Sequence, residues 1–364
     1  MDHYRPVPGT AIKDLDTPCL LVDLDAVEHN LQAVADTYRD TECKMRQHTK
    51  NIKSPRLATM QIEAGGTVGG VCTAKLSEAE VMVEGGVTDI LIPNQVVHKD
   101  KIARMCALAR QADMKVCVDN LQNVQDLSDI ADAYGVKIGV LIEVDTQMGR
   151  AGVRSNEAGV AIARLAESLP GVDFKGVMSH QSLKEFIDHE DRFKVGRETI
   201  QICLDVKAAI EAEGIDVEMV SSGETFTIDV AIGMDGVTEV EGGTYALGGT
   251  MYDYMDDYLI ANKVLGTIIS TPRPGVAIGD VGLVALSERG ADSLEDMPGV
   301  TIDTVLDDHI VLRSDGAMPL EVGAKFVVIP SYQDMMINRW DQYIAVRDGK
   351  VEQVWDIPGR GCTQ

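Results

Sequence analysis

The chain has 364 residues, of which 45% are hydrophobic and 25% charged, with 34 glycines and 12 prolines. This composition excludes a disordered or collagen-like chain, and the length fits a barrel of about 250 residues with a smaller second domain. The formal net charge of −25 argues against general nucleic-acid binding and against an anionic membrane surface, because both partners require clustered lysine and arginine.

The sequence also bears on the cellular compartment. No apolar run approaches the roughly 18 residues that a membrane span needs, and the first residues lack the apolar core of a signal peptide. The seven cysteines form no C-x-x-C pair, and several have apolar neighbours. We therefore expect reduced, mostly buried thiols in a cytoplasmic protein.

Short β-branched runs alternate with amphipathic segments over the first two thirds of the chain. The predicted strands are 43–48, 68–73, 89–93, 115–119, 137–145, 173–179, 217–222 and 238–247. Residues 99–112 and 190–213 keep apolar side chains at helical spacing, and Asn120 and Gly135 fit the two cap positions of another helix. Such alternation implies parallel βαβ units, which predict a (β/α)8 TIM-type barrel with its active site at the carboxyl ends of the strands. An open doubly wound sheet is the alternative, but its G-x-G-x-x-G motif does not follow the first strand.

After about residue 259 the alternation of strand-like and helical segments gives way to short strand-like runs. Turn dipeptides there separate the short β-branched runs 264–270, 275–282, 300–306, 309–313, 325–329 and 342–347. We therefore expect a barrel over residues 26–258 and a C-terminal, mainly-β domain over residues 259–364. The N-terminal segment 1–25 carries a strand-like run that either joins the β domain or precedes the barrel.

Lys50 stands where the first predicted barrel strand meets its loop, within the stretch RQHTKNIKSP at residues 46–55. A strand end inside a barrel can desolvate an ammonium group and lower its pKa, as a Schiff-base lysine requires. A surface lysine at the start of a loop is the simpler alternative.

Two later loops have the composition of a phosphate site. The stretch SSGETFT, at residues 221–227, ends the seventh predicted strand, and GGTY, at residues 242–245, lies at the end of the eighth. Small hydroxyl residues and glycine at such strand ends can hold a phosphate on backbone N–H groups, although ordinary turns share this composition. Combined with Lys50, these loops indicate a phosphorylated aldehyde cofactor that is held at both ends.

Residues 46–55 resemble the R-x-H-x-K-x-x-K-[ST]-P stretch of fold-type III pyridoxal-phosphate enzymes. More narrowly, the chain resembles the D-threonine aldolase, 3-hydroxy-D-aspartate aldolase and D-serine dehydratase group, whose barrel is alanine racemase-like. Further matching stretches lie at residues 16–26, 70–80, 143–153 and 346–355. The resemblance therefore covers the chain from Asp16 nearly to its last residue.

The resemblance implies pyridoxal 5′-phosphate as the cofactor and gives roles to individual residues. Lys50 would form the Schiff base with the cofactor and act as a base at the substrate Cα, with His48 beside the ring. Arg150 and Gln181 would also border the ring. The phosphate would lie in a cup made of Ser222, Gly223, Thr225, Gly243, Thr244 and Tyr245.

One late segment departs from the family pattern P-x-H-x-[CD], which binds a divalent metal. Asp334 keeps the acidic ligand position, but Tyr332 stands where histidine is expected. A neutral phenol is a poor ligand for manganese or magnesium compared with imidazole, so the substitution calls the metal into question. His309 matches a histidine of the family pattern, and we expect it to act with Asp334 on the substrate's β-hydroxyl.

The leading prediction is a lyase that cleaves β-hydroxy D-amino acids by retro-aldol chemistry to glycine and an aldehyde. The alternatives are a dehydratase of D-serine or 3-hydroxyaspartate, a metal-independent amino-acid racemase or epimerase with Tyr332 as its second acid–base group, and a non-catalytic cofactor carrier. The separate β domain argues against a carrier. The resemblance also implies a homodimer that acts on a small amino-acid substrate, without nucleic-acid or membrane partners.

Overall fold

The computed structural model describes residues 4–181, 188–252, 254–287 and 292–364. The chain divides into two compact units. The barrel unit comprises Val34–Lys50, Pro55–Gly243 and Cys362–Gln364, and the β unit comprises Met1–Ala33, Asn51–Ser54 and Thr244–Gly361. None of the helices within the described residues is long and apolar enough to cross a bilayer.

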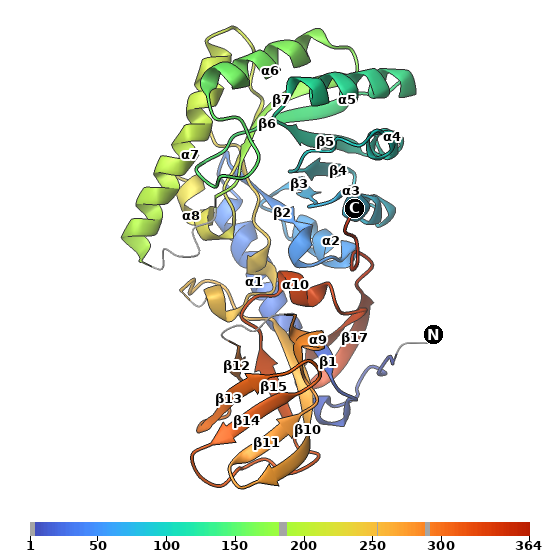
Figure 1. Cartoon of the computed structure of the whole chain (residues 1–364), viewed down its shortest axis with the longest axis vertical. Coiled ribbons are helices and arrows are strands. Elements are labelled where there is room, and N and C mark those ends of the chain that lie inside the picture. Colours follow the sequence, from blue (N-terminus) through green and yellow to red (C-terminus); the bar gives the residue numbers. More distant parts are fainter. Residues whose placement is uncertain (1–3, 182–187, 253, 288–291) are drawn as a thin grey trace. The chain divides into compact units, whose positions relative to one another are not determined.

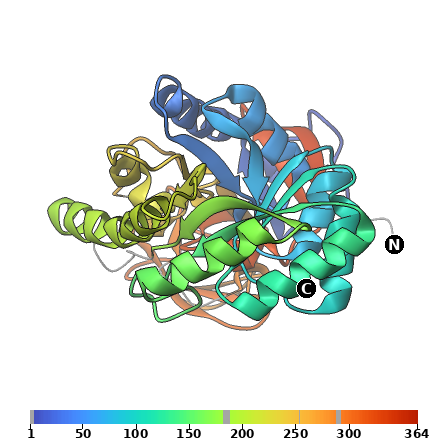
Figure 2. The same cartoon turned by 90° about the horizontal axis from the view of Figure 1, so that it is seen from above.

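Parallel strands form a closed ring in the barrel unit, with helices on the outside (Figures 1 and 2). The strands close in chain order: β2 (Lys44–His48), β3 (Thr67–Cys72), β4 (Asp89–Ile92), β5 (Asp113–Val118), β6 (Ile138–Glu143), β7 (Val172–Ser179), β8 (Met219–Ser222) and β9 (Glu239–Val240). The helices that follow the strands are α2 (Pro55–Ala64), α3 (Leu76–Glu84), α4 (Lys99–Leu108), α5 (Leu121–Tyr134), α6 (Asn156–Ser168), α7 (His189–Glu211) and α8 (Ile228–Ala231). The predicted (β/α)8 barrel is confirmed.

Helix α5 illustrates how the sequence sets a local element. The Asn120 side chain accepts hydrogen bonds from the N–H groups of Gln122 (2.9 Å) and Asn123 (3.3 Å), and Gly135 ends the helix with a φ of +66°. An amide side chain satisfies the first free N–H groups of a helix, and glycine adopts the left-handed cap conformation without strain. Both predicted caps of this helix are therefore confirmed.

The eighth barrel strand is much shorter than predicted. Its expected range was 238–247, whereas β9 covers only Glu239–Val240 and is followed by a 3₁₀ helix at Thr244–Ala246. Gly242 and Gly243 lie between them and favour a turn. The apolar residues after this turn are buried without belonging to a strand, so a hydrophobic run alone was a misleading signal.

The β unit contains a mixed sheet with the strand order β13-β14-β11-β10-β1-β16-β17, and β15 pairs with β10 and β12. Its strands are β1 (Cys19–Asp23), β10 (Asn262–Arg273), β11 (Val276–Gly279), β12 (Ser293–Leu294), β13 (Val300–Val305), β14 (Ile310–Ser314), β15 (Lys325–Ile329), β16 (Gln342–Arg347) and β17 (Lys350–Asp356). Strand β1 pairs with β10 in antiparallel and with β16 in parallel orientation. The helix α1 (Leu24–Tyr38) follows β1, and the short helices α9 (Leu283–Leu286) and α10 (Asp334–Ile337) lie in the β unit. The predicted mainly-β C-terminal fold is confirmed.

Strand β17 was not predicted, although its hairpin turn was recognised. Asp348 and Gly349 have φ values of +50° and +71°, which is the geometry of a type I′ turn between β16 and β17. In β17, Val351 and Trp355 are buried and Val354 is half-buried, and the exposed residues Glu352 and Gln353 follow Val351. This spacing weakens the alternating pattern that a sequence search relies on.

Candidate active site

The barrel interior toward the amino ends of the strands is filled by an ion cluster. Arg46 on β2 is 2% exposed, and its guanidinium donates hydrogen bonds to Glu239 at 2.8 and 3.0 Å and to Asp89 at 2.5 Å. Lys115 adds an ion pair with Asp89 at 3.2 Å. Because each charge faces an opposite charge, this layer of the barrel is electrostatically compensated.

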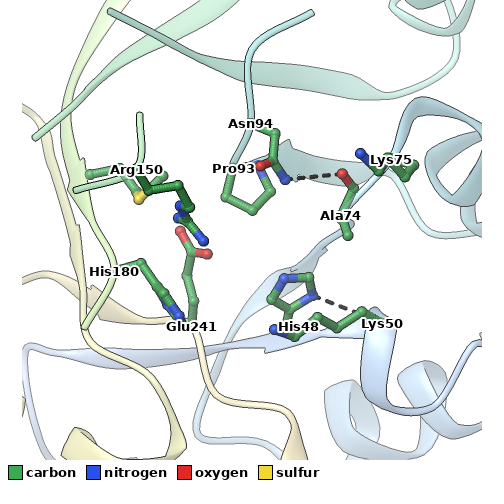
Figure 3. A pocket seen from close by; sticks show the side chains of 10 residues that line it. His48, Lys50, Ala74, Lys75, Pro93, Asn94, Arg150, His180 and Glu241 are labelled. Atoms are coloured by element: carbon green, nitrogen blue, oxygen red, sulfur yellow. Dashed lines mark hydrogen bonds between the residues drawn. The ribbon is translucent and has the colours of Figure 1, made fainter. Parts of the chain in front are cut away.

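A cavity of about 230 Å³ lies at the carboxyl ends of the same strands (Figure 3). It is lined by His48, Lys50, Ala74, Lys75, Pro93, Asn94, Arg150, Met178, His180 and Glu241. The structure thus brings together Lys50, His48 and Arg150, three of the predicted site residues. This end of a TIM-type barrel is where active sites are found.

Lys50 follows β2 directly and lies in a short 3₁₀ helix, Thr49–Asn51. It is half-buried, and its backbone N–H donates to the Nδ1 atom of His48 at 3.4 Å. The two residues thus flank one turn at the end of a strand, with both side chains on the cavity wall. A lysine in this position can present its amine to a ligand while its backbone stays fixed by the barrel.

Arg150 reaches the cavity from the segment after β6. Its guanidinium lies 3.2 Å from the carboxylate of Glu143, which is the last residue of β6 and is buried. The other carboxylate oxygen of Glu143 accepts a hydrogen bond from Gln95 at 2.5 Å. The ion pair with Glu143 therefore keeps the positively charged guanidinium of Arg150 beside the cavity.

The sequence analysis missed two cavity residues whose side chains can accept a proton, and one of them is Glu241. Its side chain is 5% exposed and accepts a hydrogen bond from Ser221 Oγ at 2.8 Å. Burial raises the pKa of Glu241 to about 7, and the neighbouring charge of Glu239 raises it further, whereas the Ser221 hydrogen bond lowers it. Two glutamates at alternate positions of a predicted buried strand, the second directly before two glycines, were the signal that marked this position.

The other missed residue is His180, which directly follows β7. Its imidazole is half-buried in the cavity wall. Burial, with the positive charges of Lys50 and Arg150, lowers the pKa of His180 to about 3, so the ring is neutral at physiological pH. The signal in the sequence was its place at the end of a predicted barrel strand, beside Gln181.

The predicted ring neighbour Gln181 is 1% exposed and lies beside the end of β8. Its Nε2 atom donates to Ser179 Oγ at 2.8 Å, and Ser179 Oγ is 2.7 Å from Ser222 Oγ. Its Oε1 atom is buried and has no hydrogen-bond partner within the part of the chain that the structure describes. A buried carbonyl oxygen without a donor is costly, so this atom is suited to a ligand.

The loops after β8 and β9 meet within the barrel unit. The N–H group of Gly243 donates to Thr225 Oγ1 at 3.2 Å. Gly223 has a φ of +117°, and a Cβ atom on it would lie 3.0 Å from Thr227 Oγ1. Four predicted cup residues, Ser222, Gly223, Thr225 and Gly243, therefore surround the ends of two adjacent strands with hydroxyl and N–H groups.

The remaining predicted residues belong to the β unit. The carboxylate of Asp334, in α10, accepts hydrogen bonds from the hydroxyl of Tyr332 at 2.6 Å and from the amide of Asn51. Asn51 also donates to Thr244 Oγ1 at 3.0 Å. The structure therefore brings Tyr332, Asp334 and Thr244 into one network. Tyr245 is buried near Tyr258, with 5.8 Å between the ring centroids.

His309 lies in the turn between β13 and β14 and is exposed. Among the described residues, the group of three or more histidine, cysteine or acidic side chains that could share a metal ion is His48, Cys72 and Glu241, and it includes neither Asp334 nor His309. Both oxygens of Asp334 already accept hydrogen bonds. Asp334 with Tyr332 and Asn51 is therefore a poor donor set for a divalent cation, and the metal role of Asp334 stays an untested prediction.

Comparison with known proteins gives a consistent result along the whole chain. Residues 22–251 match the family described as "Alanine racemase, N-terminal domain", and residues 261–346 match "Putative serine dehydratase domain". The chain is 34% identical to the D-threonine aldolase of Arthrobacter sp, a match that covers 98% of this chain and 96% of that protein. It is also 34% identical to the 3-hydroxy-D-aspartate aldolase of Paracoccus denitrificans (strain Pd 1222), over 98% and 95% of the two chains.

A solved structure is similar over the same extent. The D-threonine aldolase from Filomicrobium marinum has a TM-score of 0.94 to this chain at 31% sequence identity, and the match covers 99% of both chains. The similarity therefore includes the barrel strands, the loops at their carboxyl ends and the β unit.

Proposed function

The chain belongs to the family with an alanine racemase-type N-terminal domain, and on this premise we propose that it is a pyridoxal-phosphate-dependent lyase. Its reaction would be the retro-aldol cleavage of β-hydroxy D-amino acids to glycine and an aldehyde. The observation that carries this proposal is the cavity at the carboxyl ends of the barrel strands, in which Lys50 lies beside His48 and Arg150. The names of the two 34% identical relatives support this reaction class.

The residues present fit pyridoxal phosphate. Lys50 offers an amine for the aldehyde, and the loops around Ser222 and Gly243 offer hydroxyl and N–H donors for the phosphate. The buried Oε1 atom of Gln181 accepts from no donor within the described residues and would gain one from a ligand. When bound, this cofactor supplies an electron sink for the bond that breaks at the substrate Cα.

The side chains of the cavity would carry out proton transfer at Cα and stabilise negative charge. The amine of Lys50 would deliver a proton to Cα and remove one from it. The guanidinium of Arg150, held by the buried Glu143, keeps a positive charge where negative charge develops. The walls of the barrel keep these groups in fixed positions, so little reorganisation is needed during the reaction.

The cleavage itself requires one further proton transfer. The proton of the β-hydroxyl leaves while the Cα–Cβ bond breaks, and the oxygen forms the carbonyl group of the aldehyde. The electron pair of the broken bond stays with Cα, which then takes up a proton to give glycine. A group that accepts the hydroxyl proton must therefore lie in or beside the cavity.

A dehydratase is the second candidate function, because residues 261–346 match a putative serine dehydratase domain. A dehydratase removes the Cα proton and expels the β-hydroxyl as water, so the products are a keto acid and ammonia. The two reactions share the lysine and the electron sink and differ in the fate of the β-hydroxyl.

Proton NMR in deuterated water tests this proposal. The protein, supplied with pyridoxal phosphate, is incubated with D-threonine or D-3-hydroxyaspartate, and the L-enantiomers serve as controls. We expect glycine with acetaldehyde or glyoxylate from the D-enantiomers only. A keto acid would instead identify a dehydratase, and loss of the Cα proton signal without cleavage would identify a racemase or epimerase.

A further inference from the structure

The cavity offers few side chains that can accept the proton of a substrate hydroxyl. Lys75 and Arg150 carry amine and guanidinium groups, which are proton donors at neutral pH, and Lys50 is required for the cofactor. The Nδ1 atom of His48 accepts the backbone N–H of Lys50 at 3.4 Å. His180 and Glu241 remain as the candidate proton acceptors of the cavity wall.

We propose that His180 is the catalytic base that accepts the β-hydroxyl proton during cleavage. This inference rests on the proposed lyase function and deepens it, because it names the group that activates the substrate's hydroxyl. In the reverse direction, the same imidazole would return the proton to the aldehyde oxygen.

The backbone of His180 is held on both sides. Its carbonyl oxygen accepts a hydrogen bond from Thr146 Oγ1 at 2.8 Å, and the next residue, Gln181, is anchored to Ser179 Oγ. Figure 3 shows the imidazole on the wall of the cavity whose lining includes Lys50 and Arg150. These contacts fix the backbone of His180 at the point where its side chain enters the cavity wall.

The charges around His180 also suit this role. Burial, together with the charges of Lys50 and Arg150, lowers the pKa of His180 to about 3, so the imidazole is neutral and can accept a hydrogen bond from a hydroxyl. The phosphate of the cofactor and the carboxylate of an amino-acid substrate bring negative charge into the cavity. Their entry counters the two cations, so the imidazole becomes a stronger base when the site is filled.

Glu241 is the other candidate for the base, but its carboxylate is already engaged by neighbouring side chains. Its carboxylate accepts a hydrogen bond from Ser221 Oγ at 2.8 Å, and it also interacts with the buried thiol of Cys72. Only 5% of its surface is exposed. His180 is more accessible and is therefore the group that a substrate hydroxyl can reach.

Protons and electrons balance in this step, so it needs no oxidant or reductant. The hydroxyl proton moves to the imidazole of His180, the oxygen lone pair forms the carbonyl bond, and the Cα–Cβ bond breaks with its electron pair left on Cα. Lys50 then delivers a proton to Cα and regains one from solvent, and His180 releases its proton to solvent. The products are glycine and an aldehyde.

The test compares two reactions of the cofactor-loaded enzyme. Cleavage of D-threonine needs a base at the β-hydroxyl, whereas exchange of a glycine Cα proton in deuterated water needs Lys50 only. For H180Q we expect kcat for cleavage to fall by about 10²- to 10⁴-fold, the contribution of a general base. Exchange of the glycine proton and the Kd of pyridoxal phosphate, measured by absorbance titration, are expected to stay within about threefold.

The matched control is H98Q, which removes an exposed imidazole at the start of α4 in the same unit. Unchanged cleavage in H180Q would overturn the inference, and so would parallel loss of cleavage, glycine exchange and cofactor binding. Selective loss of cleavage in E241Q with normal cleavage in H180Q would assign the base to Glu241 instead. If H180Q does not fold, recovery of cleavage when imidazole is added to H180A provides the second test, and the absence of recovery contradicts the inference.

The unmodified enzyme separates failure of this inference from failure of the proposed function. If it exchanges the glycine proton but cleaves no β-hydroxy D-amino acid, the lyase function itself is wrong. If it cleaves D-threonine and H180Q does so equally well, the lyase function stands and only the role of His180 is wrong.

Discussion

Two layers inside the same barrel use charged side chains in opposite ways. Toward the amino ends of the strands, Arg46 on β2 pairs with Glu239 on β9. Two residues further along the same strand face, His48 follows Arg46 and Glu241 follows Glu239, and both line the cavity. The first layer is closed by ion pairs, whereas the second brings several nitrogen bases and cations to one open space.

The ion-paired layer around Arg46 stabilises the fold, whereas the cavity layer holds the side chains that can react. Opposite charges in the Arg46 layer compensate one another, so they cannot take part in chemistry. In the cavity, burial and the positive charges of Lys50 and Arg150 lower the pKa of His180, so its imidazole stays neutral and able to accept a proton. Three substitutions and one metal-removal experiment test this division of the barrel.

Lys50→Ala is expected to abolish cleavage, with a loss of more than about 10³-fold, because it removes both the amine that binds the cofactor and the proton carrier at Cα. Glycine formation measured by NMR and the visible absorbance of the loaded protein report this effect. Lys99→Ala changes an exposed lysine on α4 and serves as the control. An intact absorbance band in Lys50→Ala would contradict the cofactor assignment.

Arg46→Met is expected to destabilise the fold by about 3–5 kcal/mol, because it leaves the buried carboxylate of Glu239 without its partner. Urea unfolding measures this change. Arg104→Met is the matched control, since its pair with Glu80 is 40% and 34% exposed and contributes less than about 1 kcal/mol. Equal effects of the two substitutions would show that the Arg46 layer is not a stabilising element.

Glu241 is expected to make the stability of the cofactor-free protein depend on pH. Its folded pKa of about 7 lies above the value of an unfolded glutamate, so the folded state binds the extra proton between these two pKa values. Stability should therefore fall as pH rises from about 4.5 to 7, by about 3 kcal/mol relative to Glu241→Gln, and stay level above pH 7. Urea unfolding of both proteins at several pH values measures this difference, and identical pH profiles would refute it.

Removal of divalent metals by EDTA is expected to change the cleavage rate by less than about twofold. The reason is that both oxygens of Asp334 accept hydrogen bonds, from Tyr332 and from Asn51, which leaves a poor donor set for manganese or magnesium. NMR assays before and after dialysis against EDTA measure the rate. A loss that manganese restores would instead support the metal role predicted for Asp334.

Much of the fold was readable from the sequence because the signals were local. Caps such as Asn120 and Gly135, the strand runs and the stretch around Lys50 depend only on near neighbours. The family resemblance is confirmed by the comparisons, which extend over 98% of the chain. The predicted range of the eighth strand was wrong because two glycines turn the backbone there, and the apolar residues that follow give no sign of this turn.

The set of residues that meet in the cavity could be known only from the tertiary structure. The sequence by itself determined the barrel, the β unit and a lysine at the end of β2, because hydrophobic periodicity, caps and turns are encoded within a few residues. The resemblance already implied Arg150 beside the cofactor, but only the closed barrel decided that His180 and Glu241, at the ends of β7 and β9, share one space with Lys50. Register and closure determine which strand ends meet, and the pKa of each group depends on the neighbours that this meeting supplies.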